Sequence, residues 1–158
     1  MQYSNRRHEN NLEKYEQTHI AKALVLSCID YRFIDDVIFS LEEDQKLSQR
    51  YDLTALAGSS LAYNQKEYKH WRKTILDQIN LAIELHHIKK LIIFDHMDCG
   101  AYQMFYPDLK ANSEEERVLH FKNITKFINK MKKIFPQLIY SGYLIHTDKT
   151  IEPIVVPY

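Results

Sequence analysis

Short apolar runs alternating with amphipathic stretches are the feature that most constrains the fold of this 158-residue chain. The runs are short enough for strands, and the segments between them repeat apolar residues every three or four positions. Strands that are apolar throughout must be covered on both faces, so the pattern predicts an α/β fold with a mostly parallel sheet flanked by helices. The expected strands are Ala23–Cys28, Leu53–Ala57, Lys90–Asp95, Leu138–Ile145 and Ile151–Val156.

Three helices are expected between these strands. Helical spacing of apolar residues predicts one helix over Phe33–Leu41 and a longer one over Tyr68–His87. A third helix is expected to begin at Ser113, because Ser113 and Glu116 fit a capping box, and to end at Pro136.

The order of the strands is restricted because crossovers between parallel strands are right-handed. We expect the order 2-1-3-4, with the last strand at an edge, and the length indicates one domain over residues 1–158 that includes an N-terminal helical arm over residues 1–20. Strands 1 and 3 then lie side by side at the switch point, where folds of this type bind ligands outside the carboxyl ends of the strands.

Composition excludes several classes of function. Lys plus Arg and Asp plus Glu both number 21, which does not favour nucleic acid or an anionic membrane as partner. The N-terminal residues are polar and lack a signal or membrane-spanning segment, so a cytoplasmic location is expected. With three glycines in all, the chain has no glycine-rich phosphate loop for a nucleotide.

Potential metal ligands follow the two strands expected to be neighbours. Cys28 ends the first strand, and His96 and Cys99 follow the third. Three such ligands with one position left open are typical of catalytic zinc, whereas structural zinc usually has four protein ligands. The sequence therefore predicts one zinc ion, with Asp30 and Arg32 beside it.

Each of these residues also has a simpler interpretation. Cys28 could be a buried apolar residue or could form a disulfide with Cys99, although a reducing compartment disfavours the disulfide. Asp30 and Arg32 could be an ordinary ion pair, or the arginine could hold the carboxylate as an acceptor for a water on zinc. Gly100 is expected to permit a tight backbone after the ligands.

Two motifs resemble those of the β-class carbonic anhydrases. Cys-x-Asp-x-Arg falls at residues 28–32 and His-x-x-Cys-Gly at residues 96–100. Between them, Ala57-Gly58-Ser59 stands where the family usually has Ala-Gly-Asn. The segments Ser141–Leu144 and Thr147–Pro153 resemble the closing hairpin of the family.

The resemblance implies a zinc enzyme that hydrates CO2 reversibly to bicarbonate by zinc-bound hydroxide, which Asp30 and Arg32 would orient. In that family the aspartate can also ligate zinc in a closed state. It further implies a homodimer or a dimer of dimers, and we expect the polar Asn11–Thr18 arm to lie across a neighbouring subunit. Candidates for an apolar substrate pocket are Tyr31, Phe33, Tyr102 and Phe105, although for each of them a plain core role is favoured because aromatic residues mostly serve packing.

Two alternatives remain open at this point. Relatives of this fold hydrolyse carbonyl sulfide or carbon disulfide with the same ligands. A zinc-binding regulatory module without catalysis is the other; the replacement at Ser59 favours it slightly, whereas Asp30 and Arg32 argue against it because a structural site has no use for that pair.

Overall fold

The structure is a computed structural model that describes residues 19–156. The helical arm expected over residues 1–20, with its Asn11–Thr18 segment, falls outside this range apart from its last two residues, which are not helical. Within residues 19–156, no helix is both long enough and apolar enough to span a membrane.

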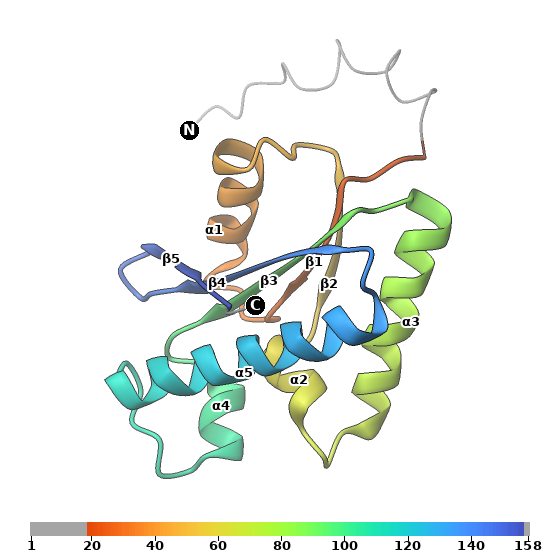
Figure 1. The fold of residues 1–158 in the computed structure, drawn as a ribbon. Coiled ribbons are helices and arrows are strands. Elements are labelled where there is room, and N and C mark those ends of the chain that lie inside the picture. The colour runs from red at the N-terminus through yellow and green to blue at the C-terminus, as the bar shows by residue number, and fades with distance from the viewer. Residues whose placement is uncertain (1–18, 157–158) are drawn as a thin grey trace.

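A five-stranded sheet in the order β2-β1-β3-β4-β5 forms the centre of the fold (Figure 1), which confirms the predicted order. Strands β1 to β4 are parallel to their neighbours, and β5 runs antiparallel to β4 as the second strand of a hairpin. The strands are β1 (Ala23–Ser27), β2 (Tyr51–Ala55), β3 (Lys90–His96), β4 (Ile139–Ile145) and β5 (Ile151–Ile154).

Helices cover both faces of this sheet, as the apolar strands predicted. Helix α1 lies on one face, and the other carries the two long helices α3 and α5 together with the short α2 (Figure 1). The helices are α1 (Ile34–Phe39), α2 (Ser60–Asn64), α3 (Lys69–His86), α4 (Gly100–Phe105) and α5 (Glu114–Ile134).

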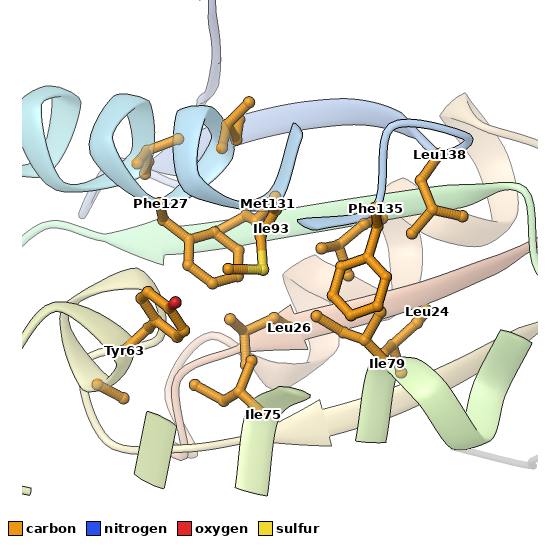
Figure 2. Packing of buried hydrophobic residues seen from close by; sticks show 14 of the residues in the cluster. Leu24, Leu26, Tyr63, Ile75, Ile79, Ile93, Phe127, Met131, Phe135 and Leu138 are labelled. Atoms are coloured by element: carbon orange, nitrogen blue, oxygen red, sulfur yellow. The ribbon is translucent and has the colours of Figure 1, made fainter. Parts of the chain in front are cut away.

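The core is divided by the sheet because alternate residues of a strand point to opposite faces. Leu24 and Leu26 of β1 pack with Ile75 of α3 and with Phe127 and Met131 of α5 (Figure 2). The alternate residues of β1 pack instead against the α1 side. Two apolar layers of this kind hold the strand ends, and therefore the residues that follow them, in fixed relative positions.

Several predicted boundaries differ from the structure. The second strand is Tyr51–Ala55 rather than Leu53–Ala57, because this edge strand is only partly buried and its apolar pattern is weak. Helix α1 is shorter than predicted and continues as a π-helical turn over Ser40–Asp44. Helix α2 was not predicted; its five residues carry a weak local signal.

The capping box predicted for α5 is only half formed. The hydroxyl of Ser113 accepts a hydrogen bond from the backbone N–H of Glu116, as expected for an N-cap. The carboxylate of Glu116 does not return to Ser113 and instead accepts from backbone N–H groups of residues 98, 99 and 112. Through these hydrogen bonds Glu116 contacts the segment between β3 and α4.

Candidate metal centre

Cys28, His96 and Cys99 converge at the carboxyl edge of the sheet. Cys28 directly follows β1, His96 is the last residue of β3, and Cys99 directly precedes α4. Since β1 and β3 are hydrogen-bonded neighbours, these segments leave the sheet side by side. One potential ligand atom from each of the three residues lies within 4.8 Å of the other two, so the group can hold a metal ion.

The separation of the two sulfurs fits a shared metal and excludes a disulfide. Sγ of Cys28 and Sγ of Cys99 are 4.0 Å apart, and both cysteines are free. Two sulfurs bound tetrahedrally to zinc lie about 3.8 Å apart, given a Zn–S bond of about 2.3 Å. A disulfide requires about 2.05 Å, so that interpretation of the two cysteines is wrong for this structure.

The imidazole of His96 is oriented for a metal by its own backbone. Its Nδ1 lies 2.9 Å from the carbonyl oxygen of Met97, which can only accept, so Nδ1 carries the proton. Nε2 is then a lone-pair donor, and it is buried with no hydrogen-bond partner among residues 19–156. A buried, unpartnered nitrogen beside two sulfurs is what a metal ligand requires.

The pKa of the Cys28 thiol is lower than that of an ordinary cysteine. The hydrogen bond with Cys99 lowers its pKa to about 4, against the opposing effect of burial and with help from His96. The backbone N–H of Gly58 also donates to Sγ of Cys28 at 3.3 Å. Gly58 has a φ of 79°, which favours glycine, and a Cβ there would lie 3.2 Å from the Cβ of Ala101. The hydrogen bond with Cys28, together with burial, raises the pKa of Cys99.

Asp30 and Arg32 form the bidentate pair that the sequence predicted. Nη2 and Nε of Arg32 donate to the carboxylate of Asp30 at 2.7 and 3.0 Å, and this hydrogen bonding lowers the pKa of Asp30 to about 2. Arg32 also donates through Nη1 to the carboxylate of Asp98 at 2.8 Å. Oδ2 of Asp30 lies 3.8 Å from Nε2 of His96, which puts the carboxylate beside the three potential ligands.

The tight backbone between the ligands falls on Asp98 rather than Gly100. Asp98 has a φ of 56°, whereas Gly100 has no positive φ and a Cβ there would meet nothing within 4 Å. The prediction for Gly100 is therefore wrong. Glu116 holds the loop instead by accepting from the N–H groups of Asp98 and Cys99 at 3.1 Å each. Sequence reasoning missed this role because the spacing of Glu116 from Ser113 signals only a helix cap.

Comparison with known proteins agrees with this geometry. The model of the family described as "Putative carbonic anhydrase" matches residues 18–155. The chain belongs to this family. A protein of Rickettsia bellii described as uncharacterized is 35% identical over 150 residues, which cover 92% of this chain and 89% of the relative. An uncharacterized protein of Rickettsia conorii is 36% identical over 135 residues, or 85% of this chain and 72% of the relative.

Solved β-carbonic anhydrases share the fold of this carbonic anhydrase family member. The β-carbonic anhydrase CafA of Aspergillus fumigatus superposes with a TM-score of 0.59 at 12% identity, over 94% of this chain and 85% of that one. A carbonic anhydrase of Glaciozyma antarctica gives 0.57 at 16% identity, over 98% and 100%. At such low identity the likeness to these structures establishes the fold alone. Together with the family match, it identifies the chain as a divergent, β-carbonic-anhydrase-like member of the family.

The segment around Ser59 keeps a defined geometry in this family member. Ser59 is buried with a φ of 48°, and its hydroxyl donates to the carbonyl oxygen of Leu26 at 3.3 Å. The replacement of the usual asparagine therefore leaves a polar side chain bonded to the end of β1, where the loop passes Cys28.

The four aromatic candidates for a substrate pocket have different environments. Tyr31 is 85% exposed and so forms neither pocket nor core. Phe33 is buried and stacks on His96, while Tyr102 is buried with its hydroxyl bonded to Asp95. Phe105 packs against the apolar group around the two cysteines. Three of the four thus lie near the metal-ligand cluster, and Phe33 touches it.

Proposed function

We propose that this chain is a zinc-dependent carbonic anhydrase that catalyses the reversible hydration of CO2 to bicarbonate. The observation that carries the proposal is the convergence of two cysteine sulfurs and an unpartnered histidine nitrogen beside an arginine-held carboxylate. In this proposal Cys28, His96 and Cys99 bind the metal, and Asp30 and Arg32 are catalytic.

The donor set favours zinc. Thiolate sulfur and imidazole nitrogen suit zinc better than the hard cations Mg²⁺ and Ca²⁺, which prefer oxygen. Three protein ligands leave one coordination position for a water or substrate. When bound, zinc supplies a nucleophile by lowering the pKa of a water toward neutrality.

Asp30 would act as a hydrogen-bond acceptor fixed in direction. Its carboxylate is ionised at neutral pH because the hydrogen bonds from Arg32 hold its pKa far below neutrality. The guanidinium of Arg32 is itself anchored to Asp98 through the side chain and, at 2.9 Å, through the carbonyl oxygen. A carboxylate held in this way can accept a hydrogen bond from the attacking water or hydroxide in one fixed direction. That hydrogen bond would orient a lone pair of the attacking oxygen toward the substrate.

The surroundings suit a small apolar substrate. Leu61 and Tyr102 pack with Cys28 and Cys99 in one buried apolar cluster, and Phe105 packs against it. CO2 carries no charge and needs little polar recognition, so an apolar wall next to the metal is sufficient to receive it.

We also propose a cytoplasmic homodimer, or a dimer of dimers, built from a single domain. The support is the family resemblance, together with the pair of free cysteines, which suits a reducing compartment. A structure described as one of two tetrameric β-carbonic anhydrases of Sordaria macrospora shares this fold, with a TM-score of 0.57, 10% identity and coverage of 85% of this chain and 80% of that one.

Stopped-flow CO2 hydration by zinc-loaded protein between about pH 6.5 and 9 tests the proposal. We expect activity that rises with pH as bound water ionises, and loss of activity in Cys99→Ser. Absence of activity at every pH in fully zinc-loaded wild type would contradict it. Carbonyl sulfide and carbon disulfide would then be tested as substrates, and failure with all three would favour a zinc-binding module.

A further inference from the structure

A group of fully buried polar side chains adjoins the candidate metal centre without belonging to it. Glu116 and His120 lie one turn apart on α5, and Asp95 precedes His96 on β3; each is at most 1% exposed. Burial of ionisable groups costs free energy unless they are paired. The chemistry proposed above uses none of the three, so their pairing calls for another role.

Glu116 holds the loop between two of the potential ligands. Its Oε1 accepts from the N–H of Cys99 at 3.1 Å, and its Oε2 accepts from the N–H groups of Asp98 and Asn112 at 3.1 and 2.7 Å. Asp98 has a φ of 56°, and the hydrogen bonds from its own N–H and from that of Cys99 hold the backbone there. The charged side chain of another element supplies these contacts.

Asp95 ties the same strand end to the segment beside the first cysteine. Its carboxylate accepts from the N–H and hydroxyl of Ser60 at 3.1 and 2.7 Å and from the hydroxyl of Tyr102 at 2.7 Å. Ser60 follows closely on Gly58, whose N–H donates to Sγ of Cys28. Asp95 therefore connects β3, α4 and the loop that contacts Cys28.

His120 joins the two carboxylates. Its Nδ1 lies 3.0 Å from Oδ2 of Asp95, and its Nε2 lies 3.7 Å from Oε1 of Glu116. Burial lowers the pKa of His120, but hydrogen bonding with Asp95 and Glu116 outweighs that effect and raises it. The ring of His120 thus lies between the two carboxylates, and its centroid lies 3.7 Å from that of the Tyr102 ring.

We propose that Glu116 and His120 are positioning residues that shape the metal centre from α5. Glu116 holds the loop between His96 and Cys99. His120 links Glu116 to Asp95 and so to the segment that contacts Cys28. The three potential ligands are thereby held close together before a metal binds. The proposal rests on the metal site proposed above, but not on the chemistry performed there.

Glu116→Gln tests the proposal directly, with Glu115→Gln as the matched control. The glutamine keeps one oxygen but turns an amide NH2 toward backbone N–H groups, whereas Glu115 is exposed on the same helical turn. We expect Glu116→Gln to weaken zinc affinity, measured by chelator competition, roughly tenfold to a hundredfold, and to shift the visible spectrum of the Co²⁺-substituted protein. Glu115→Gln should change neither.

Substitutions of His120 give a second, independent test. His120→Asn keeps a donor near the position of Nδ1, whereas His120→Leu removes it, so the asparagine variant should retain more zinc affinity. Ile128→Val, in the apolar core of the same helix, controls for general loss of stability. It should lower the melting temperature without weakening zinc affinity.

Several outcomes would overturn the proposal. One is a Glu116→Gln protein with zinc affinity within twofold of wild type and an unchanged Co²⁺ spectrum; another is an equal loss of affinity in Ile128→Val. If Glu116→Gln does not fold, equal affinity in the two His120 variants would be decisive against it. Wild type that binds zinc without hydrating CO2 would overturn the proposed function alone.

Discussion

The ring of Phe33 stacks on the imidazole of His96, with 4.3 Å between their centroids and 23° between their planes. Phe33 also contacts the hairpin between β4 and β5. There Nζ of Lys149 lies 4.3 Å from the centroid of Phe33 and donates to the carbonyl oxygen of Arg32. The hairpin, the segment after β1 and the last residue of β3 are thus packed together at the candidate metal centre.

Replacement of Phe33 should loosen His96. Phe33→Leu keeps an apolar side chain but loses the stacked ring, so we expect a loss of about 1–2 kcal/mol in the free energy of unfolding and weaker zinc binding. Phe39→Leu on α1 is the matched control because Phe39 is 62% exposed, and it should change stability by less than about 0.5 kcal/mol. Urea unfolding and chelator competition measure both effects; unaltered zinc affinity in Phe33→Leu would show that the stack does not orient His96.

The zinc content of the purified protein should depend on Cys28, His96 and Cys99. Purified protein should carry about one zinc per chain, and Cys28→Ser, His96→Ala and Cys99→Ser should each lose most of it. Atomic absorption on the four proteins measures this, with circular dichroism to confirm that each variant is folded. Full zinc retention in all three variants would rule out this centre.

Asp30 and Arg32 should affect turnover more than metal binding. Asp30→Asn removes the charged acceptor, and Arg32→Ala frees the carboxylate to rotate, so each should lower CO2 hydration by roughly tenfold to a thousandfold while zinc is retained. Arg32→Lys keeps the charge but not the two-pronged hydrogen bonding, and we expect an intermediate loss.

Arg50→Ala is the control for this pair. Arg50 directly precedes β2, at the end of the sheet opposite the centre, and its replacement should leave the rate unchanged. Rates equal to wild type in Asp30→Asn and Arg32→Ala, with zinc content checked in each, would remove the pair from the mechanism.

Acid should weaken the ion pair that joins α5 to β5. Hydrogen bonding with Arg117 lowers the pKa of Glu152 against the effect of burial, and His146 contributes further. A carboxyl group whose pKa is lower in the folded protein stabilises the fold above its unfolded pKa of about 4.3. That stabilisation is lost as the pH falls through the folded pKa.

Glu152→Gln should therefore lose less stability than wild type between about pH 6 and pH 3. Because both side chains are partly exposed, the difference should be at most about 1 kcal/mol. Melting temperatures of the two metal-free proteins across this range measure it. A steeper loss in Glu152→Gln would contradict the assigned direction of the pKa shift.

The chain should form a homodimer at micromolar concentration. The polar Asn11–Thr18 arm has few apolar residues to bury against its own domain, and it lies outside the residues that the structure describes. Light scattering on the full chain should give at least twice the mass of one chain. A strictly monomeric mass would count against the proposed assembly.

Much of the fold follows from local patterns. The apolar runs at β1 and β3 are buried on both faces of the sheet, which requires a covered parallel sheet, and the handedness of crossovers restricts the strand order to few choices, one of which is observed. Position along the chain was enough to put Cys28, His96 and Cys99 at neighbouring strand ends. Weak local signals explain the misses: β2 is a partly buried edge strand, and α2 has only five residues.

The amino-acid sequence by itself determined the sheet order, the converging cysteines and histidine, and the Asp30–Arg32 pair, because each depends on spacing within one segment or on which strands are neighbours. Only the tertiary structure decided what surrounds them. Glu116 meets the centre through contacts between segments far apart in the chain, and no local pattern encodes such contacts. Phe33 was among the aromatic candidates, but its stacking on His96 is a contact of the same kind. The tight backbone at Asp98 likewise depends on a carboxylate supplied by α5.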